Sequence, residues 1–112
     1  MCIFCGIVAG EVPADVVRSD ESALVFRDID PQAPVHLLVI PRRHITSLNA
    51  ADPADLELLG KLVLLAREAA EEVGIAETGY RLVLNVGKDG AQSVDHIHFH
   101  VLGGRELGWP PG

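Results

Sequence analysis

Apolar and polar positions alternate most regularly between residues 95 and 102 of the 112-residue chain. Single apolar residues separate three histidines in this segment: the histidines are His96, His98 and His100, and the apolar residues are Ile97, Phe99 and Val101. Successive side chains of a β-strand point to opposite faces, so this pattern predicts a strand. Its histidines would form a row on one face, and its apolar residues would face the core.

A helical period runs through residues 52–73. Asp52 is a favourable N-cap, Pro53 suits the first helical turn, and Gly74 is suited to end the helix. Apolar side chains recur at spacings of three and four residues, which predicts one buried stripe. The stripe consists of Leu56, Leu59, Val63, Ala66, Ala70 and Val73.

Shorter apolar segments predict a small helix and further strands. Residues 2–9 have helical spacing and precede Gly10, a suitable C-cap. Strands are predicted from Val16 onward and over residues 23–29, 35–40 and 80–86. The nearly all-apolar segment 35–40 should be buried on both faces. Together these elements predict an α+β fold: an antiparallel meander sheet whose apolar face is covered by the long helix, with the histidine row facing a cleft.

Composition and charge narrow the possible functions. The net charge of −7 argues against the basic face of a non-specific nucleic-acid binder, so no nucleic-acid partner is expected. No segment approaches the ~20 apolar residues of a membrane span, and the N-terminus lacks a signal-peptide pattern. We therefore expect a cytoplasmic, single-domain protein over residues 1–112, without membrane contact. In that compartment Cys2 and Cys5 should bind a metal or stay inert rather than form a disulfide.

The histidine row itself has three interpretations. It could be the solvated face of an edge strand, a metal site, or a catalytic row with histidine as nucleophile and acid or base. Repetition of one residue type on one face disfavours the first interpretation. His36, in an otherwise apolar segment, needs either a buried hydrogen-bond partner or a role beside this row.

The segment from His96 to Leu102 resembles the signature of the histidine triad (HIT) superfamily, His-x-His-x-His followed by apolar residues. Other segments resemble the Hint branch of that superfamily in the same order, and this ordered set is far more specific than any one motif. They are residues 4–8, 26–29, 31–36, 39–44, 92–93, 103–105 and the ending Trp109-Pro110-Pro111-Gly112.

This resemblance implies a HIT-like fold, a homodimer, and binding of a purine nucleoside monophosphate such as AMP or GMP. It also implies hydrolysis of nucleoside phosphoramidates or adenylated amines through a nucleotidyl-histidine intermediate, with no cofactor required for the chemistry. Two alternatives remain: a dinucleoside polyphosphate hydrolase, or a nucleotide-binding interaction protein with little physiological catalysis. The Trp-Pro-Pro-Gly ending favours the Hint branch.

The resemblance also assigns roles to individual residues. His98 matches the nucleophile, His100 would lie near the leaving group, and His36 would complete a proton relay. An imidazole suits nucleophilic attack at neutral pH because its unperturbed pKa is about 6.5. Ser93 would assist from the phosphate side.

Nucleotide contacts are expected from three further parts of the chain. Asp28 matches the acid that accepts both ribose hydroxyls. The apolar slot around the base would be formed by Phe4, Ile7, Phe26 and Ile29, some of which could equally be core residues. The loop at residues 90–93 can offer backbone N–H groups to an anion, and the phosphate side would include Asn85, Gln92 and Ser93.

A structural zinc site is the last expectation. Some members of the superfamily pair Cys-x-x-Cys with two histidines, and the matching ligands here are Cys2, Cys5, His44 and His96. This is a sound tetrahedral zinc set, although reduced, unliganded thiols remain the alternative. Asp95 departs from close relatives, which often carry an aromatic residue there, and the sequence does not define its effect.

Overall fold

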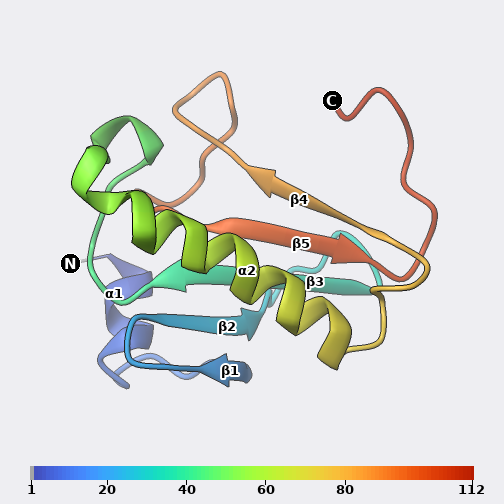
Figure 1. The fold of residues 1–112 in the computed structure, drawn as a ribbon, viewed down its shortest axis with the longest axis horizontal. Helices are drawn as coiled ribbons and strands as arrows, with labels where there is room; N and C mark the ends of the chain where they lie inside the picture. Colours follow the sequence, from blue (N-terminus) through green and yellow to red (C-terminus); the bar gives the residue numbers. More distant parts are fainter. Residues whose placement is uncertain (1) are drawn as a thin grey trace.

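Five strands form one antiparallel sheet in the computed structural model, which describes residues 2–112 (Figure 1). The strands are β1 (Val16–Ser19), β2 (Ala23–Arg27), β3 (Val35–Pro41), β4 (Tyr80–Leu84) and β5 (Phe99–Gly103). Their order is β1-β2-β3-β5-β4. The α+β prediction is confirmed. The order departs from a simple meander because the chain crosses over through the long helix to the far edge and then returns, which places β5 between β3 and β4.

The long helix α2 (Leu56–Glu72) lies across one face of this sheet (Figure 1). Its start agrees with the sequence: Asp52 and Asp55 form a capping box around a short 3-10 turn that contains Pro53. Gly74, with φ of 84°, follows the last turn in the left-handed conformation that glycine adopts readily.

The stripe predicted for α2 is only partly correct. Ala66 and Ala70 are buried, and Leu59 and Val73 pack partly buried against the core. Leu56 and Val63 are instead 76% and 42% exposed. Apolar residues occupy most of the circumference of this helix, so periodicity alone did not define its phase. The additional buried positions are Leu62, Leu65 and Ala69.

Alternation along the central strands separates two apolar clusters. On β3, Leu37 and Val39 face α2, whereas Leu38 and Ile40 pack with Phe4 on the opposite face. All of β3 after Val35 is buried, as the sequence predicted. Each face of the strand therefore belongs to a different layer, and the functional side chains lie on the face away from α2.

The short helix α1 (Ile3–Val8) covers part of that second face (Figure 1). Cys2 is its N-cap, and its Sγ accepts a hydrogen bond from the backbone N–H of Cys5 at 3.1 Å. Phe4 is buried, Ile7 packs beside it, and Gly10 has φ of 77° just beyond the helix. The predicted small helix and its glycine end are therefore present.

The histidine segment differs most from its prediction. The ladder of β5 begins only at Phe99, so His96 and His98 precede the strand rather than form a continuous row with His100. Before that point the backbone N–H of Ile97 bonds to the carbonyl of Ile45 at 2.7 Å, outside the sheet. Phe99 and Val101 do pack in the core under α2, as expected. Over residues 2–112, no helix is long and apolar enough to cross a membrane.

Candidate active site and metal cluster

A pocket of about 250 Å³ opens on the sheet face that α1 partly covers. Its lining includes His98, His100, Asp28 and Ser93. Two depressions of about 500 Å³ over Arg42 and Lys61 are larger but contain no histidine. The nucleophilic and acidic groups converge on the smaller pocket, which makes it the candidate active site.

His98 is held in one orientation by the main chain. Its side chain is buried, with 3% of its surface exposed, and its Nδ1 lies 2.8 Å from the carbonyl oxygen of His96. A carbonyl only accepts, so Nδ1 carries the proton and donates. The ring of Phe4 packs edge-on against His98, with centroids 5.1 Å apart. In the neutral form of the ring, the lone pair is therefore on Nε2.

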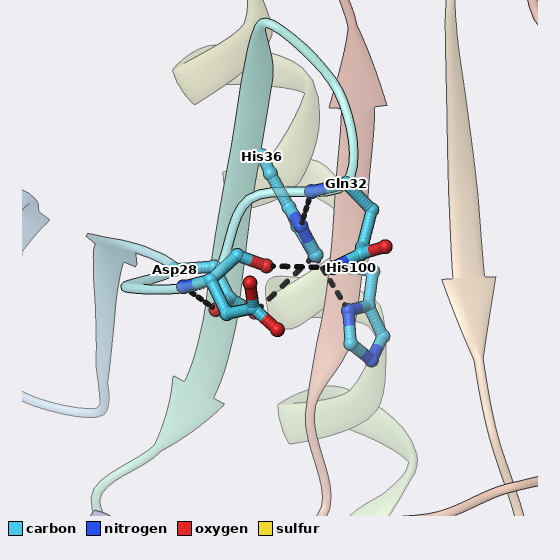
Figure 2. Close-up of polar contacts among 5 residues, drawn as sticks. Asp28, Gln32, His36 and His100 are labelled. Carbon is cyan, nitrogen blue, oxygen red and sulfur yellow. Dashed lines mark hydrogen bonds and ion pairs between the residues drawn. The ribbon is translucent and has the colours of Figure 1, made fainter.

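His36 and His100 form a hydrogen-bonded pair (Figure 2), and the ring of His100 lies against that of His98, with centroids 5.0 Å apart. His36 Nε2 and His100 Nδ1 are 2.8 Å apart, and the backbone N–H of Gln32 donates to His36 Nδ1 at 3.0 Å. One oxygen of Asp28 lies 3.4 Å from His36 Nε2. The other accepts the backbone N–H of Asp30 at 2.8 Å.

Burial keeps this pair uncharged at neutral pH. Desolvation lowers the pKa of His36, and the negative charges of Asp28 and Asp30 only partly oppose this effect. Burial also lowers the pKa of His100 to about 4, with smaller contributions from neighbouring His98 and His36. His100 is therefore a neutral ring that faces the pocket.

Four metal-binding side chains meet at the other end of the histidine segment. Cys2, Cys5, His44 and His96 place their ligand atoms within 4.8 Å of one another. The two Sγ atoms are 3.1 Å apart, and the Sγ of Cys5 lies 3.2 Å from Nδ1 of His44. The Sγ of Cys2 lies 3.4 Å from Nδ1 of His96. The four residues expected as zinc ligands are thus gathered in one cluster.

The donor set of this cluster fits a tetrahedral metal ion. Buried His96 uses its Nε2–H to donate to the carbonyl of Pro41 at 2.9 Å, which leaves the lone pair of Nδ1 directed at the sulfurs. The adjacent sulfur of Cys2 raises the pKa of the Cys5 thiol, and a cation between the two sulfurs would reverse that effect. Two sulfurs and two ring nitrogens are a common closed zinc set.

Comparison with known proteins identifies the family. The HIT domain model matches residues 9–107. This chain belongs to the HIT domain family. An uncharacterized HIT-like protein of Synechococcus elongatus is 50% identical over 110 residues, which span 98% of this chain and 96% of that protein.

Solved HIT structures share the fold. A HIT family hydrolase from Legionella pneumophila matches with a TM-score of 0.98 and 52% identity, covering 100% of both chains. A histidine triad nucleotide-binding protein from Candida albicans matches with a TM-score of 0.84 and 30% identity. The match covers 98% of this chain and 83% of that protein. A Zn-bound histidine triad family protein from Mycobacterium smegmatis matches with a TM-score of 0.79 and 34% identity. The match covers 99% of this chain and 79% of that protein. This chain therefore has the fold of a HIT family hydrolase.

Most pocket residues expected from the HIT resemblance lie together. Phe4, Ile7, Phe26 and Ile29 all line the pocket, although Ile29 is 95% exposed and stands at its rim. The lining also contains residues that the sequence did not single out. They are Ile3, Val12, Pro13, Ala14, Arg27, Leu38 and Val94. For part of this lining the sequence did offer a signal, because the apolar segment Val12-Pro13-Ala14 directly follows the end of the predicted short helix.

Two residues expected on the phosphate side are not part of the pocket lining. Asn85 directly follows β4, and neither Asn85 nor Gln92 is among the described residues that line the pocket. The side-chain amide of Gln92 donates to the carbonyls of Thr46 and Val94 at 2.8 and 3.0 Å. Its oxygen accepts the N–H of Gly87 at 3.0 Å. Gln92 thus fixes the loop that carries Ser93, and a direct nucleotide contact from Asn85 or Gln92 stays a prediction.

An ion pair that the sequence did not reveal holds the segment next to the Cys2–Cys5–His44–His96 cluster. Arg43 pairs with the buried carboxylate of Asp55 at the start of α2, and this contact lowers the pKa of Asp55. His44 follows Arg43 directly in the chain. The pair therefore ties the segment that carries His44 to the capped end of the long helix.

Proposed function

We propose that this HIT protein is a hydrolase of purine nucleoside phosphoramidates or adenylated amines that acts through a nucleotidyl group on His98. The orientation of His98 carries the proposal. Its Nδ1–H donates to the His96 carbonyl at 2.8 Å, so the Nε2 lone pair is available at the lining of the pocket. A buried imidazole with one nitrogen fixed in this way suits nucleophilic attack at phosphorus.

The first chemical step would transfer the nucleotidyl group to the protein. His98 Nε2 forms a bond to the 5′-phosphorus, and the bond from phosphorus to the leaving group breaks with its electron pair. The ring of His98 then carries positive charge, which its Nδ1–H bond to the His96 carbonyl stabilises. In the second step, water forms a bond to the same phosphorus, and the bond from phosphorus to His98 Nε2 breaks with its electron pair returning to the ring. The proton released by the water passes to solvent, and the ring is neutral again.

The pocket suits a nucleoside next to that phosphorus. Aromatic and aliphatic side chains on α1 and β2, including Phe4 and Phe26, form an apolar slot for a base. Asp28 lies on the same lining, and its carboxylate can accept two ribose hydroxyls. His100 and Ser93 lie on the side where the phosphate would sit. Groups suited to a base, a ribose and a phosphate thus follow one another along the pocket. This arrangement supports a nucleoside monophosphate as the part that all substrates share.

The experiment that tests this proposal is capture of the intermediate. Turnover of an adenosine phosphoramidate is quenched under conditions that spare the acid-labile phosphorus–nitrogen bond, and the peptides are examined by mass spectrometry. We expect a nucleotidyl group on His98. A nucleotidyl group on His36 or His100 instead would assign the nucleophile elsewhere, and unmodified peptides during rapid turnover would exclude a covalent route.

Relative turnover rates test the Hint-branch assignment. The Trp109-Pro110-Pro111-Gly112 ending supports this branch, because it was the feature of the resemblance that separated it from the polyphosphate hydrolases. We expect kcat/KM for an adenosine phosphoramidate to exceed that for a dinucleoside polyphosphate. The reverse ranking would favour the polyphosphate hydrolase alternative.

We also propose that Cys2, Cys5, His44 and His96 hold one structural zinc ion. The convergence of their four ligand atoms supports this site, as does the zinc-bound relative from Mycobacterium smegmatis. Protein atoms fill all four positions, so the ion would stabilise structure and would not activate water. Metal analysis of protein purified without chelator should give about one zinc per chain, and a value near zero would contradict the site.

A homodimer completes the proposed assembly. The strand β4 lies at the edge of the sheet, and α2 exposes Leu56, Val63 and Leu64 by 76%, 42% and 54%. An isologous contact through this edge and helix would cover both features. Light scattering at micromolar concentration should report twice the chain mass of 12.0 kDa, whereas a monomer would contradict the dimer.

A further inference from the structure

We propose that the main-chain amide of Gln32 is a positioning group that locks the His36–His100 pair in one neutral proton pattern. In this pattern His100 offers the substrate a hydrogen bond from its Nε2–H and does not act as an imidazolium acid. The consequences of this lock for turnover rest on the proposed hydrolase function. The proton pattern itself follows from contacts within the protein.

The positions of the protons follow from donor and acceptor counting. The N–H of Gln32 donates to Nδ1 of His36 at 3.0 Å, so that nitrogen holds a lone pair. A neutral imidazole has one N–H, which His36 must therefore carry on Nε2. That N–H points at Nδ1 of His100, 2.8 Å away (Figure 2). His100 Nδ1 is thus an acceptor, and the single proton of the neutral His100 ring is on Nε2.

Adding a proton to either ring would break this chain of hydrogen bonds. An imidazolium at His36 would place an N–H on Nδ1, directly against the N–H of Gln32. An imidazolium at His100 would place an N–H on Nδ1, directly against the N–H of His36. Each charged form therefore sets two donors face to face in a buried site, which is a costly arrangement.

The charged groups around the pair do not change this conclusion. Asp28 and Asp30 face His36 and favour its protonation, whereas burial opposes it, and the pKa of His36 is lowered overall. His100 is faced by His98, His36 and Asp28, and its pKa is about 4. Arg27 also lines the pocket, and it lies 3.5 Å from the carboxylate of Asp15.

Gln32 is itself held through two further groups. Its carbonyl accepts from the Nη2 of Arg105, beyond the end of β5, at 3.2 Å. Its side-chain amide donates to the carbonyl of Asp30 at 3.0 Å. These contacts hold Gln32, in the loop after β2, against the segment after β5, and they limit the movement of the N–H that faces His36.

This lock determines what His100 can give to a leaving group. If His100 gave up its Nε2 proton, His36 could replace it by passing its own Nε2 proton to Nδ1 of His100. His36 would then have no ring proton and would be an imidazolate. The Asp28 carboxylate, 3.4 Å from His36 Nε2, opposes that negative charge. When the bond to phosphorus breaks, a leaving amine must therefore take its proton from solvent at the pocket mouth. A leaving group that is already stable as an anion departs with its electron pair and needs no proton, so the rate of its release should vary less with pH.

Paired substitutions at residue 32 test the lock. Gln32→Pro removes the backbone N–H, whereas the control Gln32→Ala keeps it and removes only the side chain. The lock predicts that Gln32→Pro adds an ionisation between pH 5 and 8 to the pH profile of kcat. Gln32→Ala should show no added ionisation, because it keeps the backbone N–H, even where loss of the side-chain contact with Asp30 lowers kcat itself. Identical profiles for both variants would overturn the proposal.

Paired substitutions at residue 36 separate a neutral donor from a proton relay. The amide of glutamine can place an N–H near the position of His36 Nε2–H but cannot become charged. We expect kcat of His36→Gln to exceed that of His36→Ala by about tenfold or more, because only a hydrogen bond is needed. Equal losses in the two variants would contradict the lock and favour a relay through His36.

Nitrogen NMR of the native protein tests the proton pattern without turnover. Spectra with bound AMP should show His36 and His100 as Nε2–H tautomers from pH 8 down to pH 5.5. An imidazolium at either residue at pH 6 would overturn the proposal even if the protein is an active hydrolase. The expected tautomers in a protein without hydrolytic activity would leave the lock intact and reject the proposed function.

Discussion

His96 and His98 are two residues apart, yet the structure orients their rings in opposite ways. Both are almost fully buried, with 0% and 3% of their surfaces exposed, and each donates one ring N–H to a backbone carbonyl. His96 donates from Nε2 to Pro41 and leaves Nδ1 free, whereas His98 donates from Nδ1 to His96 and leaves Nε2 free. The residue type is the same, and the main chain decides which nitrogen is available.

The two free nitrogens face different surroundings. Nδ1 of His96 faces the sulfurs of Cys2 and Cys5, a soft set of ligands suited to zinc. His98 lines a mostly apolar pocket next to His100. Phe4 packs edge-on against both rings, with centroids 5.9 and 5.1 Å away. The two regions therefore share one aromatic wall but differ in their chemistry.

The largest expected effect comes from replacing each of the two histidines by asparagine in turn. His98→Asn should lower kcat/KM by about 1,000-fold or more, because the nucleophile is lost, while metal content stays unchanged. His96→Asn should lose the metal and reduce the rate much less. Both variants are assayed with an adenosine phosphoramidate and by metal analysis. Comparable loss of activity in both, with metal retained in both, would contradict the division of tasks.

Asp28→Asn should give the next largest change, on the pocket side only. Loss of charge-assisted hydrogen bonds to ribose would cost about 1.5–3 kcal/mol, or roughly 10- to 150-fold in nucleotide affinity. The matched control is a 2′,3′-dideoxy nucleotide, which should bind the native and variant proteins with similar affinity. Calorimetry measures all four affinities. Equal native affinity for ribose and dideoxyribose ligands would mean that Asp28 has another role.

Cys5→Ser should change the metal side with a smaller effect on the rate. The variant should lose its zinc and melt at a temperature lower by roughly 10 °C, because the ion links α1 to the segments that carry His44 and His96. We expect kcat to fall less than tenfold. A chelator should lower the melting temperature of native protein toward that of the variant and leave the variant unaffected. A native melting temperature insensitive to chelator would argue against the zinc site.

The smallest expected effect is the pH dependence of stability that arises from His100. Its folded pKa of about 4 lies below the usual unfolded value of about 6.5. The unfolded chain therefore gains the proton first, so stability from the neutral ring is present above pH 6.5 and is lost as the pH falls toward 4. We expect a loss of about 1–3 kcal/mol over that range. In urea titrations, His100→Asn should show a shallower decline between pH 7 and 5, and an equal decline would contradict this assignment.

The sequence predicted elements and clusters better than it predicted orientation. Alternation and capping residues located β3, α1 and the start of α2 because local physical chemistry dominates there. The phase of α2 was wrong at Leu56 and Val63 because apolar residues cover most of that helix. Nothing local indicates that the ladder of β5 begins at Phe99, because this depends on pairing with β3 and β4.

The sequence located most of the candidate site but not the contacts that orient it. The HIT resemblance identified most of the pocket residues and all four members of the Cys2–Cys5–His44–His96 cluster. The carbonyl of Pro41 and the amide of Gln32 act through backbone atoms, which every residue possesses, so the amino-acid type gives no signal of their roles. The Arg43–Asp55 pair depends on the tertiary arrangement of a loop and a helix start.

Long-range nitrogen–proton NMR of zinc-loaded, histidine-labelled protein tests the opposite orientation of His96 and His98 most directly. At pH 7.5 the structure predicts a proton on Nε2 of His96 and a proton on Nδ1 of His98. The spectrum should also show zinc coordination at Nδ1 of His96 and a free Nε2 at His98. The same tautomer at both residues, or zinc bound through His98, would contradict the account.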